Sequence, residues 1–455
     1  NTGLTPDSPF KTIDYALSRA FGSADNPITI HIASGTYSPS LTGEKYPLQM
    51  VKYVSLQGAG QEETFLDAEA NADYPGRVLN LDRVEGVSIS GLSLMGGFVT
   101  LAKNYNGGGI GVIESSLSLH HALIANCSSA GDGAGIYAYD SALSADSLNV
   151  AYNSALGSGG GLASVQSELT LANSIIEENS VNKNGAGISA DAGLLSIQGC
   201  SIANNQATGY QSKGGGLAVS NTVSALIRNN RIKHNKADNG AGLYLQGNSE
   251  LSLDRNQIQN NLADFNGGGL FVNTTTGLIT NNLISGNTAS QRGGGLYCYS
   301  SPQIINNTIA CNKANLQGGG LYLNGAAPSI SNSILWGNSS EQLYLFGEAA
   351  DPNISYCDVQ AGQSGMVTSP GSAYSGTWEN NLDSEPQFVE LPLGAGYYYD
   401  SGDFGLQGSS PCIDTGDPNT GISLFPLDLD GNARIDNNRI DIGAYPQVSF
   451  FSWME

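Results

Sequence analysis

The densest group of basic residues in the sequence lies between positions 228 and 236. Arg228, Arg231 and Lys233 recur there at short spacing, and Asp238 and Asp254 are acidic residues nearby. An Arg or Lys can remove a proton α to a carboxylate when acidic side chains hold a metal ion against that carboxylate, because the metal raises the acidity of the carbon. The stretch is therefore a candidate catalytic site. Since short runs of charge usually lie on solvated turns, a plain turn is the alternative that we favour.

A second set of candidate residues is aromatic. Short stretches of the sequence alternate in the manner of β-strands, with a leucine before each aromatic residue. If the leucines point into a core, the aromatic side chains point outward, one above another. The pattern predicts an exposed strip that binds a ligand, by stacking on sugar rings or contacting another protein. The alternatives are that stacking stabilises the sheet, or that the C-terminal segment covers the strip. The strip consists of Tyr244, Phe271, Tyr297 and Tyr322.

Acidic residues near the C-terminus are spaced as oxygen ligands around a glycine. Asp428, Asp430 and Asp436 surround Gly431 in the manner of a calcium loop, but the twelfth position holds Arg439, where an EF-hand has glutamate. Ca²⁺ is thus the one cofactor that the sequence suggests, and a plain turn is again the favoured alternative. The four histidines and six cysteines show neither a zinc spacing nor a nucleophile with its base, and their disulfide pairing stays open.

A repeat of about 26 residues carries most of these candidates. A Gly-x-Gly triplet recurs nine times at steps of 25 to 29 residues, and a column of asparagines keeps the same register. The glycines allow positive φ and close approach of backbones, and stacked asparagines can hydrogen-bond from one coil to the next. The triplets begin at Gly107, Gly133, Gly159, Gly185, Gly214, Gly240, Gly267, Gly293 and Gly318. The asparagines are Asn126, Asn153, Asn179, Asn205, Asn235, Asn261, Asn287, Asn312 and Asn338.

A unit of this size cannot bury a core alone, so successive units must stack, with each strand paired in parallel to its counterpart. The sequence therefore predicts an all-β fold, a parallel β-helix solenoid with a cap at each end. Residues 1–27 form the N-terminal cap segment, in which residues 9–21 have the spacing of an amphipathic helix. Residues 28–363 form the β-helix, with regular coils over 107–338. Residues 364–455 form an irregular C-terminal cap region.

The composition excludes several classes of partner. With 40 acidic and 18 basic residues the net charge is −22, which repels nucleic acid and anionic lipid over most of the surface. No apolar run approaches the roughly 18 residues of a transmembrane helix. The chain opens without a signal-peptide pattern, and we expect either a removed leader or an excised fragment. The polar, acidic composition favours a secreted or cell-surface bacterial protein.

The repeat resembles a known family. Residues 282–289 and 293–297 read N-L-I-S-G-N-T-A and G-G-G-L-Y. This unit is similar to the right-handed β-helix repeats of pectin-lyase-like proteins, and most closely to bacterial surface proteins related to polymorphic outer-membrane proteins. Residues 5–13 and 32–37 are similar to the opening of such proteins, and residues 410–416, 428–431 and 441–445 to their close. The resemblance covers nearly the whole chain and implies a right-handed helix, but the family includes adhesins, structural proteins and polysaccharide-degrading enzymes.

The catalytic elements of that family are matched only in part. Its polygalacturonase-like hydrolases share N-T-D, D-D, G-H-G and R-I-K elements, of which only the last is present, as Arg231-Ile232-Lys233.

We therefore expect an extracellular protein with a structural, adhesive or assembly role, whose partner is a polysaccharide or another surface protein. One alternative is a polysaccharide lyase or glycoside hydrolase that acts on an acidic polysaccharide in a groove. Another is a self-associating, filament-forming subunit, because strand edges at both ends of a solenoid could template pairing.

Overall fold

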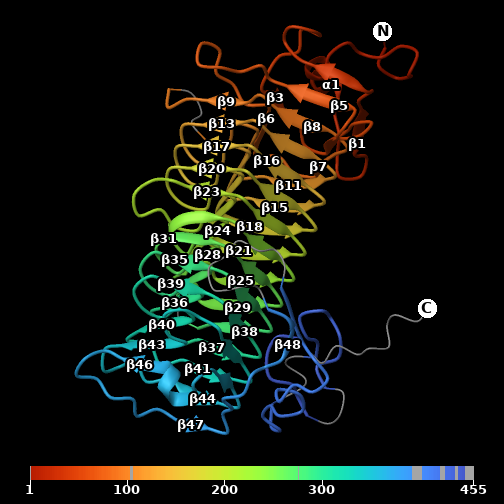
Figure 1. The fold of residues 1–455 in the computed structure, drawn as a ribbon. Helices are drawn as coiled ribbons and strands as arrows, with labels where there is room; N and C mark the ends of the chain where they lie inside the picture. The colour runs from red at the N-terminus through yellow and green to blue at the C-terminus, as the bar shows by residue number, and fades with distance from the viewer. Residues whose placement is uncertain are drawn as a thin grey trace. The chain divides into compact units, whose positions relative to one another are not determined.

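The computed structural model describes residues 2–102, 106–274, 276–391, 402–420, 426–435 and 439–445. The chain divides into two compact units, Asn1–Thr222 (unit 1) and Val223–Glu455 (unit 2). In each unit the chain winds through short strands, and every full turn of the winding is called a coil below (Figure 1). Strands of successive coils pair in parallel, which confirms the predicted all-β parallel β-helix.

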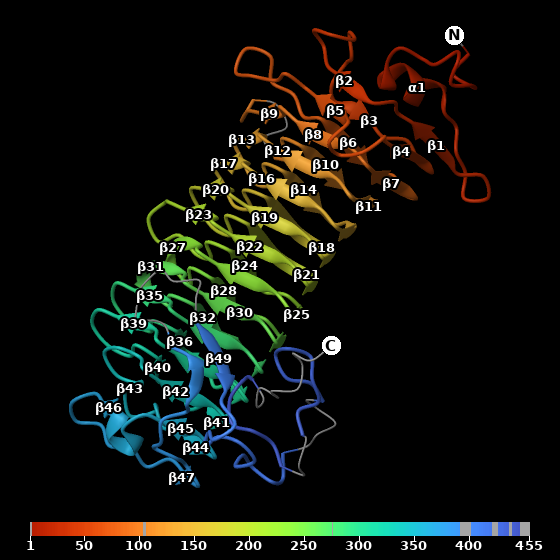
Figure 2. The ribbon, with the colours of Figure 1, turned by 45° about the vertical axis from the view of Figure 1, so that its right-hand side comes forward.

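Unit 1 contains the helix α1 (Ile13–Arg19) and three parallel sheets (Figure 2). The first sheet has two columns of strands on its coils, which merge in the long strands β18 and β21. One column holds β3 (Leu48–Gln49), β6 (Leu79–Asp82), β10 (Ile110–Ile113), β14 (Ile136–Tyr139) and β24 (Leu217–Ser220). The other holds β1 (Ile28–His31), β4 (Val54–Gln57), β7 (Val87–Ser90), β11 (Ser116–His120), β15 (Ala142–Asp146), β18 (Leu162–Ala172) and β21 (Ile188–Gln198).

The other two sheets of unit 1 complete each coil. The second sheet contains β2 (Gly35–Tyr37), β5 (Thr64–Asp67), β8 (Ser93–Met95), β12 (Leu123–Ala125), β16 (Asn149–Ala151), β19 (Ile175–Glu177) and β22 (Ser201–Ala203). The third contains β9 (Phe98–Val99), β13 (Ser128–Ser129), β17 (Ser154–Ala155), β20 (Ser180–Val181) and β23 (Gln206–Ala207).

Unit 2 repeats this arrangement. Its first sheet has one column of β28 (Leu243–Gln246), β32 (Leu270–Asn273), β36 (Leu296–Cys298), β40 (Leu321–Asn324), β43 (Leu343–Phe346) and β46 (Met366–Thr368). The other column holds β25 (Ser224–Arg228), β29 (Glu250–Asp254), β33 (Leu278–Thr280), β37 (Gln303–Ile305), β41 (Ser329–Ser331), β44 (Asn353–Ser355) and β47 (Trp378–Glu379). The second sheet contains β26 (Arg231–Lys233), β30 (Gln257–Gln259), β34 (Leu283–Ser285), β38 (Thr308–Ala310), β42 (Ile334–Trp336) and β45 (Asp358–Val359). The third contains β27 (Lys236–Asn239), β31 (Leu262–Asn266), β35 (Thr288–Ala289) and β39 (Lys313–Ala314).

Burial alternates along the strands as the sequence predicts. In β11, Leu117 and Leu119 are buried, whereas Ser116, Ser118 and His120 are half-buried on the outer face. Each inward side chain is in register with an apolar side chain on the coil before and the coil after it. The core of each unit is therefore continuous from coil to coil, as stacking of small repeats requires.

The asparagine column forms a hydrogen-bonded ladder. In unit 2 the backbone N–H and the Nδ2 of Asn261 both donate to Oδ1 of Asn287, at 3.0 Å each. The same Nδ2 also donates to the carbonyl of Ile232 at 2.9 Å. In unit 1 equivalent bonds join Asn153 to Asn179. The predicted role of these asparagines in holding neighbouring coils together is confirmed.

The prediction that Asn126 belongs to the asparagine column is wrong. Asn126 is exposed, in a left-handed conformation with φ of 54°. Cys127 occupies the ladder position, and its backbone N–H donates to Oδ1 of Asn153 at 3.0 Å. The reason is one of register, because position 127 and not 126 lies 26 residues before Asn153.

A second ladder in unit 2 was not predicted. Asn256 donates its backbone N–H and Nδ2 to Oδ1 of Asn282, which donates in the same way to Asn307. These asparagines lie between the first and second sheets, where the chain turns. Two buried ladders therefore fix the register of the coils in unit 2.

The glycine triplet has two distinct steric roles. Gly267 has φ of +68°, and a Cβ there would lie 2.5 Å from the carbonyl oxygen of Leu270. A Cβ on Gly269 would lie 2.6 Å from the carbonyl oxygen of Gly295 on the next coil. Gly267 is thus required for a left-handed backbone conformation, and Gly269 allows the backbones of two coils to approach closely.

The predicted N-terminal cap is confirmed as the short helix α1. The hydroxyl of Thr12 accepts from the N–H of Tyr15, and the carboxylate of Glu44 accepts from the N–H groups of Ile13 and Asp14 at 2.8 Å each. These bonds satisfy donors that a helix N-terminus leaves open. The helix buries Ile13, Ala16 and Leu17.

The parallel pairing of unit 2 continues past residue 363. After the 3-10 turn η1 (Gly362–Gly365), β46 pairs with β43 and β47 pairs with β44. An antiparallel pair follows, β48 (Phe388–Glu390) with β49 (Asp403–Leu406). Its side chains Phe388, Phe404 and Leu406 pack with Leu283 and Ile334 of the second sheet. This part of the C-terminal region therefore covers the outer face of that sheet.

Candidate functional site

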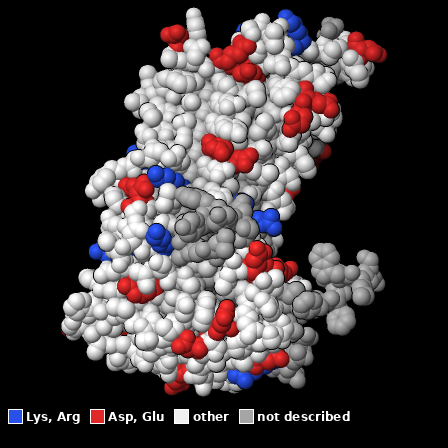
Figure 3. All heavy atoms as spheres, viewed as in Figure 1, with Lys and Arg blue, Asp and Glu red and all other residues white. Residues whose placement is uncertain are grey.

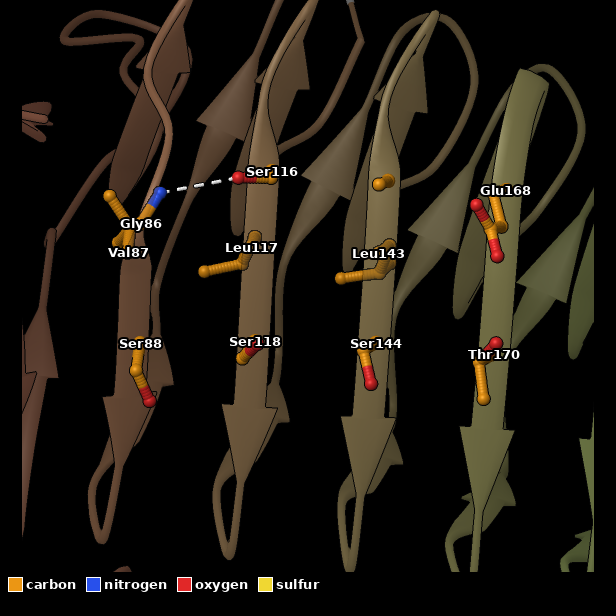
Figure 4. Close-up of a pocket in the computed structure, with 11 residues that line it drawn as sticks. Gly86, Val87, Ser88, Ser116, Leu117, Ser118, Leu143, Ser144, Glu168 and Thr170 are labelled. Carbon is orange, nitrogen blue, oxygen red and sulfur yellow. Dashed lines mark hydrogen bonds between the residues drawn. The ribbon is translucent and has the colours of Figure 1, made fainter. Parts of the chain in front are cut away.

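A shallow hollow lies on the outer face of the first sheet of unit 1, over β7, β11, β15 and β18 (Figure 4). It encloses about 320 Å³, which is at the small end of the range for ligand sites. Ser118 is in register with Ser88 and Ser144, and Ser144 is in register with Thr170. Figure 4 shows these four residues in one row across the strands. The row presents one hydroxyl group on each coil, at intervals of roughly 4.8 Å.

Most of these hydroxyl groups are available to a ligand. Among the residues that the structure describes, none hydrogen-bonds to the hydroxyl of Ser118, Ser144 or Thr170. By contrast, the hydroxyl of Ser116 accepts from the N–H of Gly86 at 3.3 Å (Figure 4). Because a hydroxyl both donates and accepts, the row can bind a polyhydroxyl ligand without a change of protonation.

The charge around the hollow is negative. Glu168 lines it and is exposed, two residues before Thr170 on β18. Acidic side chains also predominate on the face of unit 1 shown in Figure 3, in keeping with the net charge of −22. An anionic ligand would therefore be repelled from the hollow, and a neutral one would not.

A fixed carboxylate lies beside the hydroxyl row, two residues along β15 from Ser144. Asp146 follows Ser144 on β15 and is in register with His120. Its carboxylate accepts from Nδ2 of Asn173 at 2.8 Å and from the hydroxyl of Ser147 at 2.9 Å. These hydrogen bonds, that of Asn173 first, lower the pKa of Asp146, and the nearby histidines lower it further. Asp146 is therefore held in the ionised form and does not suit the role of a general acid.

The two carboxylates do not form the pair of a glycoside hydrolase. Glu168 is in register with Ala142, which lies four residues before Asp146 on the same strand. Four residues of strand span about 13 Å at ~3.3 Å per residue. Paired catalytic carboxylates lie roughly 5–9.5 Å apart. The hollow thus supports binding better than acid–base hydrolysis.

The predicted basic site is spread over two sheets. Arg228 ends β25 in the first sheet of unit 2, and Arg231 and Lys233 lie on β26 in the second, beyond a left-handed turn at Asn229. None of these residues lines the hollow over β7, β11, β15 and β18. The catalytic role of Arg228, Arg231 and Lys233 stays a prediction, and the geometry adds nothing to support it.

The carboxylate of Asp254, beside this turn, already accepts several hydrogen bonds. Asp254 is in register with Arg228. Its carboxylate accepts from Thr280, Asn281 and Arg255, each at 2.9 Å. A carboxylate with three hydrogen bonds has little capacity left for a metal ion, so Asp254 fits a structural role.

The predicted exposure of the aromatic strip is wrong. The side chains of Tyr244, Phe271, Tyr297 and Tyr322 stack in register as predicted, but they are only 2–9% exposed. They form a buried cluster that continues to Tyr344. The alternation of the strand decides which side of the sheet a residue faces, but not whether that side is covered.

Ring stacking also removes the surface that sugars would use. Centroids of successive rings lie 4.7–5.4 Å apart, with interplanar angles of 4–17°. Each ring face is thus occupied by the next ring. Burial raises the pKa of Tyr322 to about 12, and the hydroxyl of Tyr297 accepts from Nδ2 of Asn324 at 2.8 Å. The cluster fits sheet stabilisation, and ligand binding by these four residues stays a prediction without support from the geometry.

The predicted calcium ligands do not assemble into a metal site. Oδ1 of Asp428 accepts from the N–H of Asn432, and burial raises the pKa of both Asp428 and Asp430. The buried guanidinium of Arg434 lies close enough to interact with Asp428, and its positive charge opposes the binding of a Ca²⁺ ion there. In the described ranges no three His, Cys, Asp or Glu side chains come together, and Asp436 lies outside these ranges. This arrangement fits a buried turn better than a Ca²⁺ loop.

All six cysteines are buried, and none of them forms a disulfide bond with another. Burial raises the pKa of Cys127 and of Cys298 to about 12, so neither thiol is a nucleophile at neutral pH. The sequence left the disulfide pairing open, and in the structure these six residues form no disulfide bond.

Sequence inspection missed the hydroxyl row. Its signal is the alternation S-L-S-L, A-L-S-A and E-L-T-L at residues 116–119, 142–145 and 168–171, in register with the 26-residue repeat. Serines in turns and outward positions are so common in this chain that the row becomes visible only when the coils are stacked.

No described helix is both long and apolar enough to cross a membrane.

Comparisons with known proteins found similar solved structures. No curated protein sequence matches the chain. The structure is similar to the A-module of a mannuronan C-5 epimerase of Azotobacter vinelandii, with 13% identity over 80% of this chain and 93% of that one, and a TM-score of 0.37. The surface adhesin PfbA of Streptococcus pneumoniae matches at 11% identity, over 78% and 82% of the chains, with a TM-score of 0.39. The pectate lyase Pel9A matches at 12% identity, over 94% and 98%, also with 0.39.

The family comparison covers more than half of the sequence. A family model described as a right handed beta helix region matches residues 108–276 and 241–404. These segments contain all nine glycine triplets except the first residue of the triplet at Gly107. The chain therefore belongs to the family of right-handed β-helix proteins.

Proposed function

We propose that the protein is an extracellular or cell-surface β-helix with an adhesive role, which binds a neutral polysaccharide along the hydroxyl row of unit 1. The observation that carries this proposal is the row itself. Four successive coils present Ser88, Ser118, Ser144 and Thr170 in a hollow of about 320 Å³. A polymer with regularly repeated hydroxyl groups matches a protein surface with regularly repeated hydroxyl groups, since each group can donate and accept.

The charge of the hollow favours neutral over acidic glycans. Glu168 contributes a carboxylate, and no basic side chain lines the hollow among the described residues. A uronate chain would bring like charges together, and would gain no compensating ion pair. The alternative of a lyase or hydrolase acting on an acidic polysaccharide is therefore not supported at this site.

The affinity of one site should be low. No aromatic side chain lines the hollow, so the stacking contribution that often strengthens sugar binding is missing. A surface protein present in many copies can compensate by avidity, because a long polymer is bound by several copies at once. Adhesion to a polymer is thus a better match for this hollow than tight capture of a small sugar.

A matched pair of variants tests the site. Ser144→Leu places a large apolar side chain in the hydroxyl row, whereas Ser154→Leu places the same side chain on β17, on another face of the same coil. Both serines are exposed, so neither change affects the core. Affinity electrophoresis in gels with neutral glucans, xylans and mannans should show retardation of the wild type. We expect at least ten-fold weaker binding by Ser144→Leu and unchanged binding by Ser154→Leu.

Three results would contradict the proposal. The first is equal retardation of both variants, which would place binding elsewhere. The second is retardation only by polyuronates, with or without calcium. The third is cleavage of the glycan by the wild-type protein, which would identify an enzyme.

A further inference from the structure

The first strand of unit 1 leaves one edge unpaired. β1 pairs in parallel with β4, through Ile28 with Val54 and Ile30 with Leu56. No other described strand of unit 1 pairs with β1. An unpaired edge presents a row of N–H and C=O groups to any strand that can align with it.

The direction of the backbone groups can be assigned. The N–H groups of Ile28 and Ile32 donate toward β4, to the carbonyls of Tyr53 and Gln57 at 2.9 and 2.8 Å. Alternate residues of a strand direct their backbone groups to opposite sides, so those of Thr29 and His31 face the free edge. Both residues are exposed. Within the described chain, no hydrogen bond occupies their backbone N–H groups.

A cleft of about 750 Å³ lies beside this edge. Its walls come from residues 3–20, which include α1, and from β1 itself. Ile28 and Ile30 belong to the inward row of the sheet, yet they are only half-buried, whereas their partners Val54 and Leu56 are at most 1% exposed. The helical cap thus leaves the end of the core partly open, and Leu4 at the cleft is 86% exposed.

The cleft also differs from the rest of the molecule in charge. Among the described residues that line it, Arg19 is the one with a permanent charge, and none carries a carboxylate. Arg19 forms no ion pair with any described residue. A cationic cleft on a chain with a net charge of −22 is complementary to an acidic ligand.

We propose that this edge and cleft bind an extended acidic peptide of another protein by strand addition. The peptide backbone would pair with Thr29 and His31 and so add a strand to the first sheet. Apolar side chains at alternate positions of the peptide would cover Ile28 and Ile30, and a carboxylate would pair with Arg19. The proposal is independent of the hydroxyl row, which lies on other coils.

A peptide of simple design probes the site on the full chain. The probe is a fluorescein-labelled nine-residue peptide in which valine alternates with threonine, with a glutamate near one end; a second peptide carries lysine in place of glutamate. Fluorescence anisotropy should show saturable binding of the glutamate peptide to the wild-type protein and weaker binding of the lysine peptide. Hydrogen exchange should show slower exchange of the Thr29 and His31 amides when the glutamate peptide is present.

Variants separate the backbone and charge contributions. Thr29→Pro removes an N–H group that faces away from β4, as proline does on natural edge strands, and Thr29→Val removes only the hydroxyl. We expect at least ten-fold weaker binding by Thr29→Pro and little change by Thr29→Val. Arg19→Glu should reverse the preference between the two peptides, whereas Lys183→Glu, an exposed lysine away from the cleft, should not. Circular dichroism of each variant verifies the fold.

The proposal is overturned by any of three outcomes. One is that neither peptide binds at the highest soluble concentration and exchange at Thr29 and His31 stays unchanged. Another is equal binding by Thr29→Pro and Thr29→Val. The last is a concentration-dependent dimer that protects these amides without peptide, which would assign the edge to a second copy of the chain.

Discussion

The asparagine ladder makes a quantitative prediction for unit 2. In the wild type, Oδ1 of Asn261 accepts from both the backbone N–H and the Nδ2 of Asn235, at 3.0 and 3.1 Å. Its Nδ2 donates to Ile232 and to Asn287. Asn261→Ala therefore removes an acceptor that serves two buried donors and a donor that serves two buried acceptors.

The expected cost is large for a single polar side chain. A buried polar group that loses its partner costs about 1–3 kcal/mol. With two donors and one carbonyl left without their Asn261 partner, the free energy of unfolding should fall by about 3–5 kcal/mol. The matched control is Asn273→Ala, at an exposed position on the next coil, which should cost no more than about 0.5 kcal/mol.

Tryptophan fluorescence in a urea titration measures this difference. The described tryptophans Trp336 and Trp378 belong to unit 2, and the sequence has no tryptophan before Val223, so the signal reports on the unit that carries the substitution. A loss below about 1 kcal/mol for Asn261→Ala, or a loss equal to that of the control, would refute the claim that the ladder holds the coils together.

Three other predictions concern unit 2. Burial raises the pKa of Asp358 from 3.8 to about 6, so the folded state holds this proton more tightly than the unfolded state. The stability of the wild type relative to Asp358→Asn should therefore fall as the pH rises from 3.8 to about 6. The difference in melting temperature between the two proteins, measured across this pH range, checks the prediction. Gly267→Ala, with a Cβ 2.5 Å from a carbonyl, should lower the urea midpoint more than Gly325→Ala, where φ is also positive but nothing lies within 4 Å; equal midpoints would contradict the steric argument. Cys298 should react with a thiol reagent only in denaturant, and rapid labelling of the native protein would show that its burial is misassigned.

The amino-acid sequence by itself determined the fold. The spacing of the glycine triplets and asparagines specified parallel stacking, because only stacked units can bury the apolar residues of so short a repeat. The alternation of Leu243, Tyr244 and Leu245 specified that the two leucines are buried, and the structure agrees, with both at 0% exposure. The helical pattern of residues 9–21 likewise indicated the cap that became α1.

Register within the coils was predictable only in part. Asn126 has the right residue type but is one position away from the ladder, and Cys127 fills its place. The second ladder through Asn256 and Asn282 has the same 26-residue spacing, yet a sequence rich in asparagine does not reveal which of its asparagines face inward. Hydrogen-bond partners depend on the direction of the side chain at each turn.

The candidate sites depended on tertiary structure. Alternation placed Phe271 and Tyr297 on the outer side of their strands, but their burial depends on what lies over that side, which no local pattern contains. The basic residues at 228–233 are close in sequence and lie on two different sheets, because a left-handed turn separates them. Conversely, Ser118, Ser144 and Thr170 are 26 residues apart and meet in one hollow, because parallel stacking brings equal positions of successive coils together. Local periodicity thus fixed the architecture, whereas contacts between residues distant in sequence decided which surfaces remain open for binding.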